Sequence, residues 1–393
     1  MPPAVEPSPV VERRKNPHLD LLRGLLALAV FLGHARGLFL VDDRNVAHAS
    51  AVTKGLYFFT GFGTQAVLGF FVLSGLLISS SIFEAYDGNR WSWSRYLVNR
   101  LARLLVVLAP ALVLTAMWDQ MGMALFGVAR VYGGNPSAGN VVEFAVAQRS
   151  SALAFFGNVL FLQQIAVPPF GSNSALWSLG YEFWYYIAFP LGWFALLGAQ
   201  KVPVRIGLLA LGTAVVVMLG PSGDLGLVLW LMGAAATFVI RRPSLSQRAG
   251  RLLPLWLTLP LFGAALTVLR LHGLRSDSLA ELVAGVTCAL FVFTLVNRAA
   301  VSSFGRAYES GSKFLAEMSY TLYAVHLPLL VFLQAWLVGS ARWQPDPAHL
   351  LRLAGIVLVV FAYAFVISRV TEARTDDVRR FILRSSRPAS VTA

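Results

Sequence analysis

Three titratable side chains lie in stretches of the chain that are otherwise strongly apolar: His34, Glu182 and His326. Ionisable groups inside apolar segments of membrane-spanning length are rare and costly, and they often serve a function. A histidine titrates near neutral pH and is therefore suited to accept a proton from a reacting group. The three residues indicate acid–base chemistry inside a membrane. A hydrogen-bond network that only ties helices together is the structural alternative.

The first apolar segment carries two more charged groups. Asp20 precedes Arg23 by three residues, a spacing at which two helical side chains can form an ion pair. Arg23 and His34 are eleven residues apart, which returns to nearly the same helix face about 16 Å further along. We expect Asp20 to be a structural partner of Arg23 near one membrane surface, with His34 deeper in the bilayer.

A polar face also surrounds His326. Ser319, Tyr323 and His326 recur at positions i, i+4 and i+7, so they lie on one side of a helix. The segment that carries Glu182 is expected to enter the membrane from the opposite side. With that topology His34, Glu182 and His326 all lie near one depth, slightly outward of the midplane.

Basic residues between the second and third apolar segments have two interpretations. Arg100 and Arg103 are three residues apart and share a helix face, and Arg95 precedes them. They are either anchors at the cytoplasmic surface or a guanidinium clamp for phosphates, which arginine suits by its bidentate geometry. Taken alone, the anchor interpretation suffices. The small residues Ser74 and Gly75 are expected to permit close helix packing.

The elements that must position these residues are transmembrane helices. Of the 393 residues, 57% are hydrophobic and only 13% are charged, with a mean hydropathy of +0.66. Soluble domains carry about a quarter charged residues. The net charge of +13 is spread over short loops rather than one soluble face. This distribution argues against binding of nucleic acid and indicates the lipid bilayer as a partner. The sequence predicts an all-α, polytopic transmembrane helix bundle.

Ten segments are predicted to span the membrane. If they do, 22 of the 32 Lys and Arg residues lie on the side of the basic N-terminus, which predicts that both termini are cytoplasmic. The stretch 151–167 is marginal and is interpreted as re-entrant or interfacial, because a full crossing would reverse this charge bias. Residues 1–18 and 369–393 are expected to be basic cytoplasmic tails around a membrane domain at 19–368. The segments are 19–40, 63–84, 101–120, 176–198, 205–220, 225–240, 254–270, 279–297, 314–338 and 350–368.

No metal site is expected. The single cysteine, Cys288, lies in an apolar run and cannot form an internal disulfide, and no Cys/His cluster has zinc-binding spacing.

Five motifs, in this order and spread over the chain, carry a resemblance to a known family. The sequence resembles the membrane acyltransferase-3 family, which includes bacterial enzymes that O-acylate exopolysaccharides, O-antigen and macrolides. It differs from the usual pattern at Asn99, where a basic residue is common, and in having its proline only at Pro110. The hydrolase-like domain that some members carry is absent, so a stand-alone form is expected. The motifs are Leu19–Ala27 with His34, Phe70–Gly75, Arg100–Arg103, Leu176–Glu182 and Ser319–His326.

The resemblance implies an acyl-CoA-dependent O-acyltransferase of the bacterial inner membrane. It implies acyl-CoA, most often acetyl-CoA, as a co-substrate with no permanently bound cofactor, a carbohydrate acceptor, and a need for Arg23 and His34. The mechanism we expect has His34 as general base, or as the carrier of an acyl group, with Glu182 orienting it. Three arginines are expected to bind the donor, and three further residues are possible oxyanion or acceptor contacts. The donor-binding arginines are Arg23, Arg100 and Arg103. The possible oxyanion or acceptor contacts are Tyr323, His326 and Ser178.

Two other functions fit the same residues. An acyltransferase for a lipid or for a secondary metabolite such as a macrolide has no distinguishing sequence feature. A proton-coupled transporter also places His and Glu near the midplane, but it typically shows inverted repeats or paired interrupted helices, which this sequence lacks.

Overall fold

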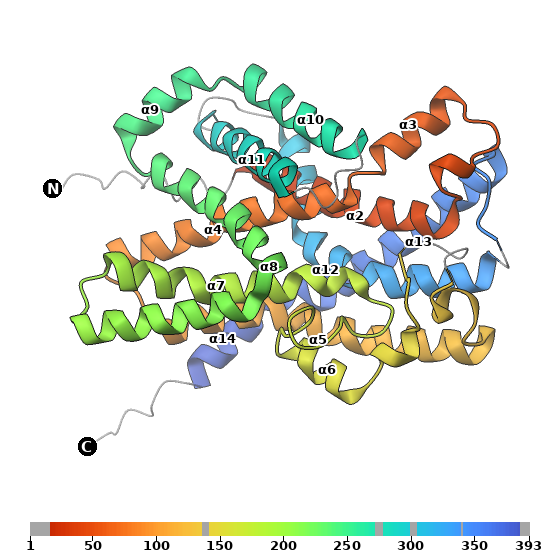
Figure 1. Ribbon diagram of the computed structural model, residues 1–393, viewed down its shortest axis with the longest axis horizontal. Helices are drawn as coiled ribbons and strands as arrows, with labels where there is room; N and C mark the ends of the chain where they lie inside the picture. The colour runs from red at the N-terminus through yellow and green to blue at the C-terminus, as the bar shows by residue number, and fades with distance from the viewer. Residues whose placement is uncertain (1–15, 136–140, 272–277, 299–304, 339–340, 386–393) are drawn as a thin grey trace. The chain divides into compact units, whose positions relative to one another are not determined.

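The computed structural model describes residues 16–135, 141–271, 278–298, 305–338 and 341–385. These residues form helices and connecting loops with no strand, apart from two isolated bridges, which confirms the all-α prediction. The α-helices are α2 (Pro17–Phe39), α3 (Ala51–Phe59), α4 (Gly63–Asp87), α5 (Trp93–Phe126), α6 (Ala152–Val159), α7 (Trp177–Leu197), α8 (Val202–Ile240), α9 (Pro243–Leu252), α10 (Leu255–Leu271), α11 (Ser278–Arg298), α12 (Arg306–Leu337), α13 (Pro347–Val370) and α14 (Thr375–Ser385) (Figure 1).

Among the described residues, eight helices are long and apolar enough to cross a membrane, or nine if the bent pair α9 and α10 counts as one span. The predicted ten include α7. At 21 residues α7 is about 31 Å long, which is sufficient to span. Its tryptophan, tyrosine and glutamate residues lower its hydropathy, which explains why α7 is not among the eight apolar helices. The predicted segments 205–220 and 225–240 are two parts of α8. The break between them is at Gly220, which has a φ of 68° and precedes Pro221.

The marginal stretch 151–167 does not cross the membrane as a helix. Its only α-helix, α6, has eight residues and is about 12 Å long. The chain then turns through Phe161 and Gln164, both with positive φ. Buried Asn158 fixes this turn: its Nδ2 donates to the carbonyls of Ala154 and Pro168, and its Oδ1 accepts from the backbone N–H of Phe170. A non-spanning segment is therefore confirmed.

The helices divide into two compact units. The chain passes between them within α2, at the start of α4, between Arg90 and Trp91, and within α7 and α12. The first unit comprises residues up to Leu26, Thr64–Arg90 and Tyr181–Ala316. In it α11 packs against α8 and α10 (Figure 1). The second unit comprises Ala27–Gly63, Trp91–Gly180 and Glu317 onward.

Glycines bring α4 and the second half of α8 close together in the first unit. A Cβ atom on Gly75 would lie 1.9 Å from the carbonyl oxygen of Trp230, and one on Gly233 would lie 1.9 Å from that of Val72. A clash with backbone cannot be relieved by turning a side chain, so a larger residue would force the helices apart. The packing role predicted at Gly75 is confirmed.

Polar contacts join the helices of the second unit. The Tyr320 hydroxyl of α12 donates to the Leu104 carbonyl of α5 at 3.0 Å. Glu372, which follows α13, accepts hydrogen bonds from the backbone and side chain of Thr321 on α12. Beyond it, within the predicted C-terminal tail, the charged helix α14 packs against α5.

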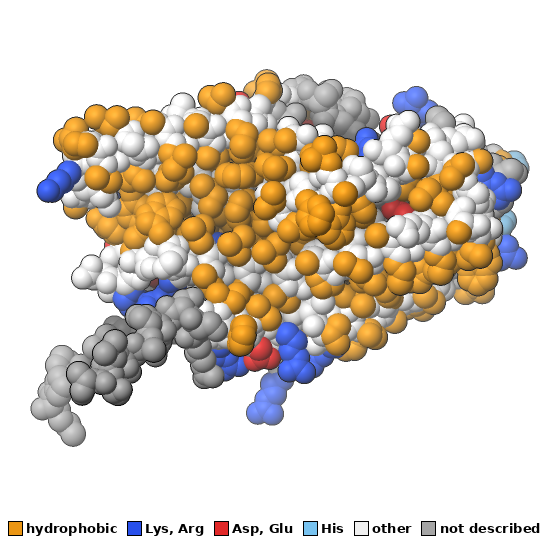
Figure 2. All heavy atoms as spheres, turned by 90° about the horizontal axis from the view of Figure 1, so that it is seen from below, with side chains coloured by type: hydrophobic (Ala, Val, Ile, Leu, Met, Phe, Trp, Pro, Cys, Tyr) orange, Lys and Arg blue, Asp and Glu red, His pale blue; other side chains and the backbone are white. Residues whose placement is uncertain are grey.

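Hydrophobic side chains cover most of the face shown in Figure 2, with Lys and Arg at its margins. Large apolar residues are strongly exposed on α8 and α13, for example Val217 at 74% and Leu351 at 75%. In a soluble protein such surfaces would aggregate, whereas acyl chains cover them in a bilayer. The structure thus shows a polytopic membrane protein.

Candidate active site

His34 of α2 and His326 of α12 are in direct contact in the second unit. The Nδ1 atom of His34 lies 2.8 Å from Nε2 of His326. The two rings stack with centroids 5.1 Å apart and planes inclined by 13°. His326 is fully buried, whereas His34 is only partly buried. The two histidines that the sequence placed at one depth are therefore neighbours, and His34 is the more accessible of them.

The hydrogen bonds of this pair assign the tautomers of the neutral rings. Nδ1 of His326 lies 2.8 Å from the Leu322 carbonyl oxygen, which can only accept, so Nδ1 of His326 carries the proton. Its Nε2 is then an acceptor, and the Nδ1–H of His34 donates to it. Nε2 of His34 keeps its lone pair and has no partner among the residues that the structure describes. The pair thus presents one ring nitrogen as a base.

A proline and a loop asparagine fix the helix around His326. Pro328 has no N–H, so the Ala324 carbonyl four residues earlier lacks its helical partner. The Nδ2 atom of fully buried Asn173 donates to that carbonyl at 2.9 Å. The Phe31 ring, on α2, packs against His326 at a steep angle, with centroids 5.7 Å apart. Unpaired backbone is costly in a membrane, so Asn173 stabilises the helix where His326 is presented.

The hydroxyls of Tyr323 and Ser178 are engaged with each other. Tyr323 donates its one O–H proton to the Ala175 carbonyl in a short hydrogen bond. The two hydroxyl oxygens are 2.7 Å apart, and Ser178 must donate because the Tyr323 proton is already used. Both residues are buried. In this arrangement neither has a proton left for an oxyanion, and they instead fix the start of α7 against α12.

An ionisable residue that the sequence reasoning missed lies in the same unit. Asp119 of α5 is 1% exposed and accepts hydrogen bonds from the backbone N–H of Ser172 at 2.7 Å and from the Ser172 hydroxyl at 2.6 Å. The next residue, Asn173, also donates to the Thr115 hydroxyl at 3.2 Å. A carboxylate within the apolar segment 101–120 was the available signal. Asp119 anchors the loop whose Asn173 supports the helix of His326.

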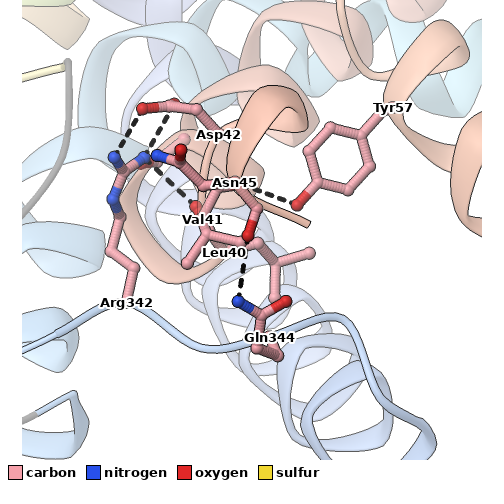
Figure 3. Close-up of polar contacts among 8 residues, drawn as sticks. Leu40, Val41, Asp42, Asn45, Tyr57, Arg342 and Gln344 are labelled. Carbon is pink, nitrogen blue, oxygen red and sulfur yellow. Dashed lines mark hydrogen bonds and ion pairs between the residues drawn. The ribbon is translucent and has the colours of Figure 1, made fainter. Parts of the chain in front are cut away.

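A clamp of polar contacts joins the end of α2 to the connection between α12 and α13 (Figure 3). The guanidinium of Arg342 pairs with both carboxylate oxygens of Asp42, at 2.9 and 2.6 Å. The same guanidinium donates to the carbonyls of Gly37 and Leu40 at 3.2 Å each, and so satisfies carbonyls at the C-terminus of α2. Because α2 and α12 carry the two histidines, this Arg342 clamp helps to set their separation.

Removing the clamp is expected to destabilise the protein. The variant Arg342→Ala loses charge-assisted bonds from a side chain that is only 7% exposed. Since the Asp42 carboxylate is partly solvated, we expect a loss of about 1 to 2 kcal/mol, measured as thermal unfolding in detergent. Arg44 is exposed and provides the matched control: Arg44→Ala should leave the midpoint of thermal unfolding unchanged.

The clamp should also depend on pH. The hydrogen bond from Arg342 lowers the pKa of the Asp42 carboxyl from its ordinary value of 3.8. A lowered pKa means that the clamp contributes fully above pH 3.8 and is lost as pH falls through the lowered value. The stability difference between wild type and Arg342→Ala should therefore be constant near neutral pH and shrink in acid. A difference that persists at the lowest pH would contradict the role of the Asp42 charge.

Arg23 lies near the other end of α2, in the first unit. Its guanidinium is 3.8 Å from the Asp20 carboxylate, and it donates to the Ala316 carbonyl of α12 at 3.4 Å. Next to it, Gly24 permits a close approach of α12, since a Cβ atom there would lie 2.5 Å from Cβ of Leu315.

The arginines of α5 differ in exposure. The Arg100 guanidinium is half-buried and lies over the Tyr96 ring at 5.4 Å from its centroid, whereas the Arg103 side chain is exposed. Trp91 and Trp93 contact the same tyrosine ring. Stacking on a buried aromatic ring limits the rotamers of Arg100 and preorganises its guanidinium for an anion.

Glu182 ends a chain of hydrogen bonds in the first unit. The Tyr186 hydroxyl donates to Glu182, the Ser74 hydroxyl donates to Tyr186 at 3.2 Å, and Nε1 of Trp230 donates to Ser74 at 3.2 Å. Every donor in this chain points toward the carboxylate. Tyr186 and Trp230 were not predicted. Ser74 was predicted only for packing, and the i, i+4 spacing of Glu182 and Tyr186 was the available signal.

A comparison with protein families gives one match. The acyltransferase-3 family, described as an acyltransferase domain, matches residues 16–369 and therefore all five sequence motifs. No curated protein and no solved structure matched the chain. Together with the apolar helices and the His34–His326 pair, the match over most of the sequence shows that this chain belongs to the acyltransferase-3 family of membrane acyltransferases.

Proposed function

We propose that this membrane acyltransferase transfers an acyl group, specifically acetyl, from acyl-CoA to a hydroxyl of a cell-surface or exopolysaccharide sugar or its lipid-linked precursor. The proposal places it in the bacterial inner membrane with both termini in the cytoplasm. The observation that carries the chemistry is the free lone pair on Nε2 of His34, fixed by the hydrogen bond to His326. A hydroxyl acceptor needs such a base, because it is a weak nucleophile while protonated.

In the proposed reaction, the acceptor oxygen attacks the thioester carbonyl while its proton moves to Nε2 of His34. The tetrahedral intermediate collapses, the C–S bond breaks, and the CoA sulfur takes the proton back from His34. An O-ester and free CoA thiol are the products. While His34 carries the extra proton, its Nδ1–H remains bonded to Nε2 of His326, whose own Nδ1–H is bonded to Leu322. This chain of dipoles stabilises the transient imidazolium, so His326 acts as a positioning residue.

The anionic nucleotide of the donor requires cations at the cytoplasmic ends of helices. Arg100 and Arg103 share one face of α5, and Arg23 lies near the start of α2. Arg100 is already ordered over Tyr96, which supports a role in phosphate binding. Exposed Arg103 remains accessible to solvent. We assign Arg100 and Arg103 to the phosphates, and Arg23 to a supporting role beside Asp20.

Glu182 is proposed to hold the acceptor or to orient the base. Its carboxylate is ordered by Tyr186 and, through it, by Ser74 of the motif Phe70–Gly75. An ordered carboxylate can accept a hydrogen bond from a sugar hydroxyl, as required for acceptor selection. Ser178 and Tyr323 support the proposed role of Glu182, because their hydrogen bonds fix the start of α7, the helix that carries Glu182.

Changing the α5 arginines should weaken donor binding. In Arg100→Gln and Arg103→Gln, we expect the apparent KM for acetyl-CoA to rise about 10-fold or more, with kcat nearly unchanged, because a charge-assisted contact is lost. Exposed Arg95 on the same helix supplies the control Arg95→Gln, which should behave as wild type. Initial rates of CoA release give both constants. Unchanged KM in both variants would exclude the phosphate role.

The proposed acceptor is tested by the O-acyl content of surface and secreted polysaccharide, measured by proton NMR. A strain lacking the gene should lose the O-acetyl signals, and wild-type protein should restore them. If deletion leaves the polysaccharide unchanged, a carbohydrate acceptor is excluded, and mass spectrometry of lipid and culture extracts then seeks an acylated lipid or metabolite.

A further inference from the structure

A cavity of about 290 Å³ with a mixed polar and apolar lining lies between α9 and α11 in the first unit. Side chains of α9 line one wall and side chains of α11 line the other. The polar residues that line it, with one glycine, are Ser246, Gln247, Gly250, Arg251, Thr294 and Asn297. No carboxylate is among the described residues of this α9 cavity.

The lining of the cavity includes donor groups that have no partner among the described residues. Oδ1 of Asn297 accepts from the Ser246 hydroxyl at 2.9 Å, so the amide orientation leaves Nδ2 as a donor. This Nδ2 is enclosed and has no acceptor within the part of the chain that the structure describes. Arg251 likewise has no ion-pair partner among those residues. A buried donor is usually paired, so an anion with several acceptor oxygens fits this cavity.

The surroundings indicate the membrane–water interface. Helix α9 is short and amphipathic, with Leu245 and Leu252 exposed beside Arg248 and Arg251. It meets α10 at a bend of 72°, as expected where a chain changes from lying along a membrane to crossing it. Trp256, at the start of α10, is 75% exposed, and tryptophan is enriched at the level of lipid headgroups.

We propose that the α9 cavity binds a phosphate ester, held by the Arg251 guanidinium and the Asn297 amide. Phosphate combines negative charge with several acceptors, which matches an arginine beside unpaired donors. At this level of the membrane the phosphate comes either from an anionic lipid headgroup or from a soluble phosphate ester. Gly250 lines the cavity, and a Cβ atom there would meet no atom within 4 Å, so a larger side chain can be introduced at this position without a clash.

The full-length protein, purified in detergent, is titrated with three probes while bound ligand is measured by native mass spectrometry. The probes are dioctanoyl phosphatidylglycerol, dioctanoylglycerol, which has the same chains without phosphate, and glycerol 3-phosphate, which has phosphate without chains. Wild type is compared with Arg251→Gln, with Gly250→Leu, which fills the cavity without removing a polar group, and with Arg248→Gln. Arg248 lies on the same helix and does not line the cavity, so it controls for general charge.

We expect wild type to bind dioctanoyl phosphatidylglycerol at least 10-fold more tightly than dioctanoylglycerol. Arg251→Gln and Gly250→Leu should each lose about 10-fold in affinity, and Arg248→Gln less than 2-fold. Tight binding of glycerol 3-phosphate identifies a soluble source, and its weak binding identifies a lipid. Equal binding of the two lipids, or equal losses in Arg251→Gln and Arg248→Gln, overturns the proposal.

Discussion

The variant His34→Ala is expected to lower kcat for acyl transfer by about 10² to 10⁴, the usual contribution of a general base. The loss should appear in kcat, with little change in the KM for acetyl-CoA, because His34 receives the acceptor proton only as the new bond forms. Stopped assays of ester product at saturating acetyl-CoA measure this effect.

The control for this prediction is another histidine. His48 is exposed in the loop between α2 and α3, and His48→Ala should retain full activity. Size-exclusion profiles and thermal unfolding in detergent must match wild type for both variants, so that a folding defect is not mistaken for lost chemistry. If folded His34→Ala retains more than a tenth of the wild-type rate, His34 is not the general base.

Hydropathy and charge bias were sufficient to predict the spanning helices, because a membrane requires long apolar segments with internally paired backbone. The same bias identified 151–167 as non-spanning, and α6 is indeed only eight residues long. Hydropathy also placed the two histidines at one depth, since α2 and α12 both enter the membrane from the cytoplasmic side in the predicted topology and each carries its histidine beyond its middle. Their direct contact follows from side-chain packing, which hydropathy cannot supply.

Other parts of the site depend on contacts between residues distant in sequence. Asn173 lies in a loop, and nothing in its neighbours shows that its amide reaches the Ala324 carbonyl. Pro328 does show that some donor is required there. Tyr323 was predicted as a possible oxyanion or acceptor contact, and the structure shows its hydroxyl donating to the Ala175 carbonyl. Motif residues could thus be chosen from sequence, but their hydrogen-bond directions could not.

A charged residue within an apolar segment was the most useful sequence signal, but Asp119 was overlooked. Like Glu182, it is a carboxylate within an apolar segment, and it is almost completely buried. Because buried carboxylates need donors, Asp119 implied a polar partner from another part of the chain. Ser172 is that partner in the structure.

The second prediction with a large effect concerns His326, which has no free ring nitrogen. In His326→Leu the Nδ1–H of His34 loses its acceptor, and the His34 ring is free to rotate or to adopt the other tautomer. We expect kcat to fall between about 10-fold and 100-fold, as for the partners that orient histidine ligands of metals. In His326→Gln the amide oxygen can still accept from His34, so this variant should recover part of the rate.

A loss of activity alone would not separate orientation of His34 from a packing defect, but the double variant does. If His326 acts only through His34, His34→Ala with His326→Leu should be no slower than His34→Ala, because the group that was oriented is already absent. A defect in helix packing would add to the loss instead. Additive losses, or a His326→Gln variant as slow as His326→Leu, would assign His326 to packing and leave His34 as a base that needs no partner.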